Sequence, residues 1–527
     1  MRVCWWCLFV LFVGCYGSTS ESYTAAVVEF LPVNYESEVI AAMEQEILLR
    51  VPDEFAVSSS YVNAVKMLNL KRYEHFVKQA KEQEADIIVF PEDTTTGWPI
   101  GFDNGRDGAL PWLEQVPPMQ SQPYLMNELQ FSSPAVFYAS QFAYQNNITV
   151  VIDIGEVVWC NGTQTQSECT PDGRWQFNTQ LAFNPSGALI GKHRKLHLFL
   201  ADTEIFNYPE ESLDTFESFG VEFGMLVCFD IWFSYPGFAL ASQKNIENFV
   251  LSSWWENNGT LPLVSAVNMQ QSFARAAQSN LLACSVGLGF MNSGSGIYNG
   301  VSGEQSYNFD PQFLQREDVL IVQELPKSPR SSSFDSPKPS KRISVDSLSH
   351  IRAQHNEKES RIRNTFISLP DSPSYVTLDV APGKTIEATA TNNDLECFFN
   401  VTFATGDNIN STSTFVAMAY QGPYFDDLLQ ADLCAIYRCA DRHFNRGNCE
   451  TLTIESDVAF TEIEITGSFS SQQNVYAMAS QNKGQLLPMS SIMIDRSSSF
   501  SAMKVFNSSV QIVNTVLYAP SIKQNYY

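Results

Sequence analysis

Strand-like and helix-like segments alternate along the chain from Tyr23 to about Leu325, and this alternation constrains the fold more than any other feature. Tyr23 to Phe30 and Asp86 to Phe90 are short apolar runs typical of buried strands, whereas the stretch from about Tyr61 to Glu84 has helical spacing. The later expected segments are, in chain order, a helix at Pro134 to Tyr144, strands at Ile148 to Ile154, Thr179 to Asn184 and Gly220 to Cys228, a helix at Pro236 to Gln243, a strand at Phe249 to Ser252, a helix at Pro262 to Ser279 and a strand at Leu281 to Val286. This order predicts a layered α/β domain.

The composition changes after Leu325. Residues from Pro326 to about Arg363 are mostly Ser, Pro and charged, with few large apolar side chains, and such a stretch cannot bury enough surface to order itself. Beyond Thr365 short segments rich in β-branched and aromatic residues predict a second, mostly β domain. We therefore expect a signal peptide at 1–17, an α/β domain at 18–325, a flexible insertion at 326–365 and a β-rich domain at 366–527.

The first residues have the three-part form of a secretory signal peptide. Met1-Arg2 precedes an apolar run from Val3 to Val13 and a small-residue stretch from Gly14 to Ser18, with cleavage expected near Gly17. The run is too short to span a membrane, and the tail from Tyr518 to Tyr527 lacks the apolar stretch of a GPI signal. We expect a secreted protein without a stable membrane anchor.

Sequons and charge fit an extracellular protein that acts on neither nucleic acid nor anionic membranes. A net charge of −25 would repel both of these partners. The expected N-glycosylation sites are Asn147, Asn161, Asn258, Asn400, Asn410 and Asn507.

The cysteines predict disulfides rather than a metal site. Of 11 cysteines, Cys4, Cys7 and Cys15 fall in the expected signal peptide. Cys160 and Cys169 flank a short loop and predict a local bridge, while the cluster Cys397, Cys434, Cys439 and Cys449 predicts two bridges with three possible pairings. Cys228 and Cys284 remain as free thiols. The mature chain has neither Cys-x-x-Cys nor His-rich spacing, so we expect no metal.

Three reactive side chains lie near expected strand ends. Glu92 follows an apolar strand and Pro91, Lys195 closes the basic run GKHRK, and Cys228 ends an apolar strand. Helix capping, solvation and core packing would explain each of them separately. Together they match what a thiol needs to attack a carbonyl, because the reactive thiolate forms only with a nearby base or cation.

Several sequence blocks resemble one enzyme family. FPEDTTTGWP, GKHRKLHLF and CFDIWFSYPG are similar to the three signatures of the nitrilase superfamily. SSWWENNGTLPLVSAVNMQQSFARAAQSNLLA and NSGSGIY resemble its vanin and biotinidase branch, whose secreted members carry a β domain with clustered cysteines. The resemblance covers most of residues 23–325 and, more weakly, 366–470. It implies an α-β-β-α sandwich followed by the β-rich domain, and a hydrolase that needs no cofactor.

The resemblance also implies roles for individual residues. Glu92 would be the general base, Cys228 the nucleophile that forms a thioester, and Lys195 would stabilise the oxyanion together with the backbone amide of Phe229. Some superfamily members place a second carboxylate near the lysine, and Glu204 is our candidate here.

The resemblance leaves the roles of other residues around the site open. Asp202 is the alternative to Glu204 as the second carboxylate. We expect His193 and His197 to be structural. The residues expected to line the acyl pocket are Trp254, Trp255 and Tyr298, which could equally be core residues.

The substrate expected from the resemblance is a small molecule with a linear amide. Vanins cleave pantetheine to pantothenate and cysteamine, and biotinidases cleave biocytin to biotin and lysine. We expect pantetheine rather than a biotinyl amide. The alternatives are biotinidase-like hydrolysis, acyl transfer to an amine, and a non-catalytic secreted glycoprotein with the same fold. The sequence leaves the oligomeric state open.

Overall fold

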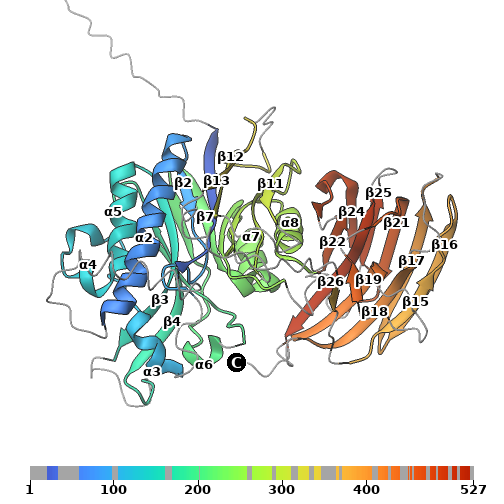
Figure 1. Cartoon of the computed structure of the whole chain (residues 1–527), viewed down its shortest axis with the longest axis horizontal. Coiled ribbons are helices and arrows are strands. Elements are labelled where there is room, and N and C mark those ends of the chain that lie inside the picture. Colours follow the sequence, from blue (N-terminus) through green and yellow to red (C-terminus); the bar gives the residue numbers. More distant parts are fainter. Residues whose placement is uncertain are drawn as a thin grey trace, which may run out of the picture.

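The computed structural model places most of the chain in two domains that lie side by side (Figure 1). The residues it describes are 21–33, 59–97, 105–160, 169–200, 202–257, 264–287, 292–309, 318–331, 338–345, 364–366, 369, 371–405, 414–424, 429–439, 449, 451–453, 456–469, 475–481, 485–496, 501–506 and 511–522. The expected signal peptide and the sequons at Asn161, Asn258, Asn410 and Asn507 lie outside these residues. The sequons at Asn147 and Asn400 are described, and both side chains are exposed.

Two facing sheets form the centre of the first domain. The seven-stranded sheet has the order β13-β12-β1-β2-β3-β4-β5, and the six-stranded sheet has the order β11-β10-β9-β8-β7-β6. The strand bounds are β1 Ser22–Glu29, β2 Ile87–Val89, β3 Thr149–Trp159, β4 Arg174–Phe183, β5 Leu189–Arg194, β6 Thr215–Ser218, β7 Val221–Val227, β8 Asn248–Ser252, β9 Asn280–Cys284, β10 Ser295–Asn299, β11 Gln305–Asn308, β12 Asp318–Pro326 and β13 Lys341–Val345. Side chains such as Val27 and Val151 from one sheet pack against Met225 and Val250 from the other. The strands are strongly apolar because both faces of each sheet are covered.

Helices cover the outer faces of the two sheets. The long helix α2 (Ser59–Glu82) and α5 (Pro134–Asn146) pack on the seven-stranded sheet, and α7 (Ala239–Gln243) and α8 (Ala266–Ala277) pack on the six-stranded one. Helix α5 starts at Pro134, where the missing N–H of proline costs no hydrogen bond. The residue that follows its last turn, Asn147, caps the helix in the left-handed conformation. The α-β-β-α sandwich predicted from the sequence is confirmed.

Part of the expected flexible insertion is ordered, so that interpretation is wrong for these residues. β13 adds to the edge of the first sheet by pairing with β12, and the half-buried Ile343 packs on the core beneath. Arg330 donates to the carbonyl oxygens of Ile246 (3.0 Å) and Ala277 (2.9 Å). The edge of β12 and these backbone carbonyl oxygens are the partners that order this part of the insertion. The composition of the insertion alone does not reveal them. Residues 332–337 and 346–363 lie outside the described part.

The second domain is built from strands, as predicted. One sheet has the order β14-β20-β19-β26-β22-β23 with β15 and β18 joined to it, and the other has the order β16-β17-β21-β25-β24. The bounds are β14 Asn364–Phe366, β15 Ser374–Leu378, β16 Thr385–Asn392, β17 Leu395–Phe403, β18 Thr414–Tyr424, β19 Leu429–Cys439, β20 Thr451–Thr453, β21 Phe460–Gly467, β22 Tyr476–Gln481, β23 Gln485–Leu486, β24 Ile492–Arg496, β25 Ser501–Phe506 and β26 Ile512–Ile522. Buried and exposed residues alternate along most of β17, so one face of its sheet meets the core.

The predicted disulfides are confirmed. Cys160 and Cys169 form the local bridge, and the open pairing in the second domain is resolved as Cys397–Cys434 and Cys439–Cys449. The bridge from Cys397 on β17 to Cys434 on β19 joins the two β sheets. Cys228 and Cys284 are the free cysteines of the described chain, and both are buried.

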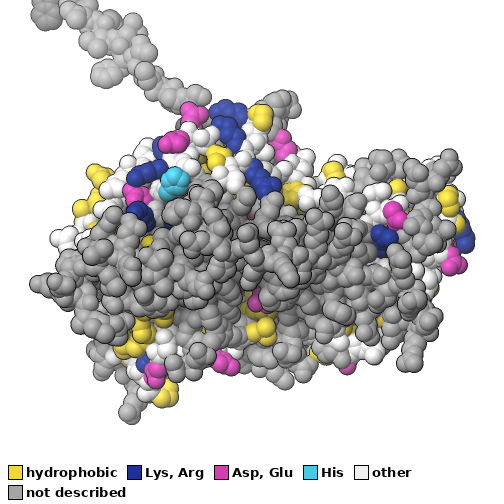
Figure 2. All heavy atoms as spheres, viewed as in Figure 1, with side chains coloured by type: hydrophobic (Ala, Val, Ile, Leu, Met, Phe, Trp, Pro, Cys, Tyr) yellow, Lys and Arg dark blue, Asp and Glu magenta, His cyan; other side chains and the backbone are white. Residues whose placement is uncertain are grey.

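The described surface carries charges of both signs. Figure 2 shows acidic and basic side chains interspersed on the part of the α/β domain nearest α2 and β13. On α2, for example, Lys78 pairs with Glu74. None of the described helices combines the length and the apolarity needed to cross a membrane.

Candidate active site

Glu92, Lys195 and Cys228 come together between the two sheets. Glu92 follows β2, Lys195 follows β5 and Cys228 follows β7, so all three lie at the carboxyl ends of strands, where α/β sheets present functional groups. Their exposed fractions are 2%, 2% and 8%. The structure therefore brings the three predicted residues into one buried site.

Several donors fix the carboxylate of Glu92. Oε1 accepts hydrogen bonds from Lys195 Nζ (2.7 Å) and Asn178 Nδ2 (2.8 Å), and Oε2 accepts one from the backbone N–H of Trp254 (2.8 Å). Asn178 on β4 also accepts the backbone N–H of Lys195 through its carbonyl (2.9 Å). Glu92 and Lys195 are thus positioned by the same strand.

Cys228 begins a short 3₁₀ helix, η5 (Cys228–Trp232), with a φ of 40°. A non-glycine residue in this left-handed region costs about 1–2 kcal/mol, so the surrounding contacts must hold it there. The thiol Sγ lies 3.8 Å from the carbonyl oxygen of Trp254. The backbone of Trp254 therefore contacts both the candidate base and the candidate nucleophile.

The electrostatics of the site keep the thiol protonated at rest. Burial and the neighbouring Glu92 raise the pKa of Cys228 well above its ordinary value, and Lys195 opposes this only in part. Burial alone would favour a neutral amine, but Asp202 and Glu92 raise the pKa of Lys195 well above its ordinary value. The resting site thus combines a thiol with a charged ammonium, and the thiol needs a base in order to react.

The second carboxylate at Lys195 is Asp202, and the prediction of Glu204 is wrong. Lys195 Nζ lies 2.6 Å from Asp202 Oδ2, which also accepts the backbone N–H of Phe199 (3.1 Å). The two acidic residues sit on the short helix α6 (Asp202–Ile205), where Asp202 is buried and Glu204 is exposed. Asp202, the first residue of α6, therefore faces Lys195, and Glu204 does not. The number of residues between Lys195 and each of these carboxylates does not reveal which one faces the amine.

We expect Asp202→Asn to lower kcat roughly 10- to 100-fold with little change in KM, because it removes one of the two carboxylates that keep Lys195 charged and aligned. Glu204→Gln is the matched control and should stay within about twofold of the wild type, since Glu204 is exposed. Steady-state kinetics of both variants give the comparison. Equal losses in the two variants would contradict the assignment.

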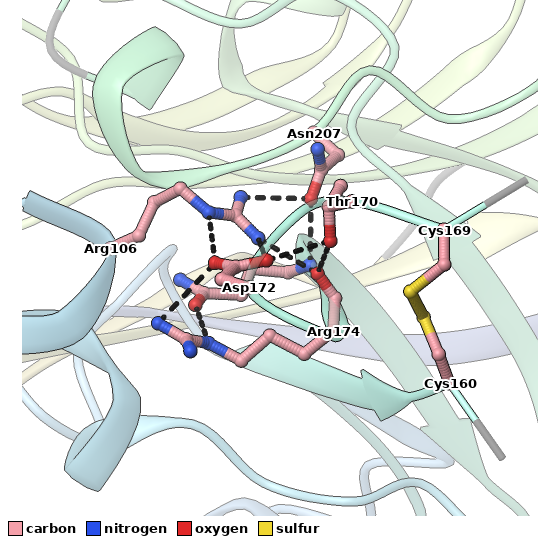
Figure 3. Close-up of a disulfide and its surroundings, with 8 residues drawn as sticks. Arg106, Cys160, Cys169, Thr170, Asp172, Arg174 and Asn207 are labelled. Carbon is pink, nitrogen blue, oxygen red and sulfur yellow. Dashed lines mark hydrogen bonds and ion pairs between the residues drawn. A yellow bond between two sulfur atoms is a disulfide. The ribbon is translucent and has the colours of Figure 1, made fainter. Parts of the chain in front are cut away.

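Arg106 connects a hairpin closed by a disulfide to the turn that carries Asp202, and Figure 3 shows its contacts with Asp172 and Asn207 near the Cys160–Cys169 bridge. Arg106, on α3 (Gly105–Ala109), pairs with Asp172 (2.8 Å) beside the Cys160–Cys169 bridge. The same guanidinium donates to the carbonyl oxygen of Ile205 (3.1 Å) and to Asn207 Oδ1 (2.9 Å). Arg106 thereby joins the hairpin to the end of α6.

Asp230, two residues after the thiol, organises a buried cluster that the sequence did not predict. Its Oδ2 accepts the backbone N–H of Val227 (3.1 Å) and lies 3.0 Å from His193 Nε2, while its Oδ1 lies 2.9 Å from His197 Nδ1. His193 Nδ1 lies 2.9 Å from Asp214 Oδ2. Both histidines contact Asp230, and these contacts brace the segment that carries Cys228.

The cluster makes stability depend on pH. Burial opposes a charged imidazole, but Asp214 and Asp230 outweigh it and raise the pKa of His193 to about 9. The resulting stabilisation is fully present below the unfolded pKa of about 6.5 and is lost as pH rises through about 9.

We expect the free energy of unfolding of the wild type to fall by on the order of 3 kcal/mol from this group between pH 6.5 and pH 9 and above. His193→Gln should flatten that dependence, whereas the control His75→Gln, at an exposed position on α2, should keep it. Denaturant unfolding at several pH values measures both. An unchanged slope in His193→Gln would count against this account.

The predicted pocket residues divide into two groups. Trp254 contacts Glu92 and Cys228 through its backbone. Trp255 stacks on Trp232 (5.7 Å between ring centroids), and Tyr298 donates to Gln270 Oε1 (2.9 Å) within the core. Trp254 thus lies at the site, whereas the described contacts of Trp255 and Tyr298 are core contacts. In the described part of the chain, no group of three or more His, Cys, Asp or Glu residues is arranged to hold a metal ion.

Comparisons with known proteins match both domains. Residues 57–309 match the family model described as carbon-nitrogen hydrolase, and residues 365–527 match the vanin C-terminal domain. The chain is 26% identical to pantetheinase from Homo sapiens over 484 residues, which is 91% of this chain and 85% of that protein. It is 30% identical to biotinidase from Takifugu rubripes over 298 residues, which is 55% of this chain and 57% of that protein.

A solved structure is similar to part of the chain. Nit3 from Saccharomyces cerevisiae, a member of branch 10 of the nitrilase superfamily, has 20% sequence identity and a TM-score of 0.40. The match covers 59% of this chain and 93% of that one.

Proposed function

Because the chain belongs to the vanin and biotinidase family of the nitrilase superfamily, whose carbon-nitrogen hydrolase domain it carries, we propose that it is a secreted amidohydrolase that cleaves pantetheine. The observation that carries the proposal is the contact of 2.7 Å between Lys195 Nζ and Glu92 Oε1 at the strand end beside the Cys228 thiol. A thiol, a carboxylate and a buried ammonium together supply a nucleophile, a base and an oxyanion partner.

In the proposed first half-reaction, Glu92 takes the proton of Cys228 as sulfur attacks the amide carbon. The oxyanion is stabilised by Lys195, with the Phe229 amide as the second donor that the family resemblance implies. When the carbon-nitrogen bond breaks, Glu92 returns the proton to the departing amine and a thioester remains.

In the second half-reaction water replaces the amine. Glu92 takes a proton from water as the oxygen attacks the thioester carbon, and the proton then returns to the sulfur as the acid leaves. The raised pKa of Cys228 suits this cycle, because the thiol is the stable resting form and the departing thiolate readily accepts the returning proton. Asp202 keeps Lys195 charged in both halves.

We take pantetheine as the proposed substrate because the more extended of the two matches described above is to a pantetheinase, while the identity is higher in the match to the biotinidase, 30% against 26%. The match to human pantetheinase runs through both domains, 91% of this chain, whereas the match to the Takifugu biotinidase covers 55% of it. The test is a parallel assay of cysteamine release from pantetheine and biotin release from biocytin. We expect a higher kcat/KM on pantetheine, and a higher value on biocytin would replace the proposed substrate with the biotinyl one.

Export from the cell is supported by the covalent chemistry of the chain. The three disulfides are typical of oxidising compartments, and the exposed Asn147 and Asn400 can accept glycans. Expression in animal cells should place the protein in the medium with a mass that falls on treatment with an N-glycosidase. Retention in the cytosol as an unmodified chain would overturn this part of the proposal.

A further inference from the structure

The β domain contacts the segment that carries the thiol. The hydroxyl of Tyr476, at the start of β22, donates a hydrogen bond of 2.8 Å to the carbonyl oxygen of Ile231, which is 245 residues away in sequence. Ile231 lies in η5, three positions after Cys228. The last carbonyls of any short helix have no partner within it, so this one is satisfied from the other domain.

Aromatic packing provides a second contact at the same place. Trp232, the last residue of η5, is 2% exposed and meets the ring of Tyr518 edge-on, with 5.2 Å between centroids. Trp232 also stacks on Trp255, with 5.7 Å between centroids. Trp255 adjoins Trp254, whose backbone contacts both Glu92 and Cys228.

Buried hydrogen bonds also join the two domains around these contacts, and they fix the position of one domain against the other. Asn268 Nδ2 donates to Ser480 Oγ (2.7 Å), and Gln271 Nε2 donates to the carbonyl oxygen of Leu487 (2.7 Å), both from α8. One continuous apolar core includes α8, η5 and the β sheet that carries Tyr476. Hydrogen bonds between buried groups allow few alternative arrangements, so β22 is held in place relative to η5.

We propose that the β domain is part of the catalytic apparatus and that Tyr476 is a positioning residue, which holds η5 so that Cys228 keeps its left-handed backbone beside Glu92 and Lys195. The backbone of Cys228 is strained and persists only while its surroundings determine it. Asp230 restrains η5 from within the α/β domain, and Tyr476 restrains it from the β domain. This positioning role rests on the proposed function only for the identity of the reaction that Cys228 carries out.

Tyr476→Phe tests the proposal with little risk to the fold, since only one hydroxyl is lost. We expect kcat to fall about five- to tenfold, the range that one lost hydrogen bond can produce, with KM changed less than twofold. The matched control is Tyr437→Phe, which removes a hydroxyl that is buried in the same domain and donates to the carbonyl oxygen of Cys449 (2.7 Å). The control should lose similar thermal stability but keep kcat.

A second measurement needs no amide substrate. The rate at which iodoacetamide labels Cys228 follows the thiolate fraction, so its pH profile reports the pKa of the thiol. Loosening η5 should admit water and move the midpoint at least half a pH unit downward in Tyr476→Phe but not in Tyr437→Phe. Tyr518→Leu, which removes the ring on Trp232, should act in the same direction.

The outcomes separate the inference from the proposed function. If Tyr476→Phe and Tyr437→Phe lose equal stability and keep the wild-type kcat and labelling midpoint, Tyr476 only holds the domains together and the inference is wrong. If the wild type hydrolyses neither pantetheine nor biocytin, the proposed function fails. A shifted labelling midpoint in Tyr476→Phe would still support the positioning role in that case.

Discussion

Replacing Cys228 with alanine should lower the rate of amide hydrolysis by at least about 10⁴-fold, because the proposed thioester forms on its sulfur. The protein should still fold, since alanine is smaller and adopts the same backbone conformation no less easily. Cys228 is 8% exposed and packs at a strand end, so the cost to stability should be on the order of 1–2 kcal/mol. Cysteamine release and thermal unfolding give the two readouts.

The chain contains its own control for this experiment. Cys284 is also a free, fully buried thiol, and its Sγ lies 3.3 Å from the carbonyl oxygen of Leu251. Burial raises the pKa of this thiol too, but Cys284 is the last residue of β9 and its thiol contacts the backbone of the neighbouring strand β8. Cys284→Ala should keep activity within about twofold at a comparable loss of stability. A folded Cys228→Ala that retained a tenth of the wild-type rate would remove Cys228 from the proposed mechanism.

The fold of the first domain was predictable because its strands are short apolar runs separated by breakers and helices. Ile87 to Val89 forms a strand just as the pattern indicated, and the helix expected from Tyr61 to Glu84 spans Ser59–Glu82. The same rule places Glu92 and Cys228 just beyond the carboxyl ends of their strands, β2 in the seven-stranded sheet and β7 in the six-stranded sheet that faces it. β13 escaped prediction because its order comes from the free edge of β12 and not from its own composition.

The direction of individual side chains and the contacts between distant residues could not be predicted from the sequence. Asp202 and Glu204 have nearly the same distance from Lys195 along the chain, and only the first turn of α6 decides which of them faces the amine. The contact between Tyr476 and Ile231 joins residues in different domains, and no periodicity or motif relates them. Asp230 contacts two histidines, His193 on β5 and His197 just beyond that strand, and no sequence motif relates them to it.

Lys195→Met should abolish most of the activity and also weaken the fold, and these two effects must be separated. The side chain is 2% exposed and lies between Glu92 and Asp202, so its loss leaves two buried carboxylates without their cation. Breaking a buried ion pair costs about 3–5 kcal/mol. Losing an oxyanion donor costs about 10²- to 10³-fold in kcat, and the pKa of Cys228 rises further without the ammonium.

The pair of Lys66 and Glu114 provides the matched control. Lys66 Nζ lies 2.9 Å from Glu114 Oε1, and the side chains are 2% and 1% exposed, but this pair joins α2 to the start of α5 and not to the strand ends. Lys66→Met should therefore lose similar stability and keep kcat/KM within about threefold when both variants are assayed at the same interval below their own Tm. If both variants lost activity equally, Lys195 would be a structural charge partner, and oxyanion stabilisation would have to come from backbone amides alone.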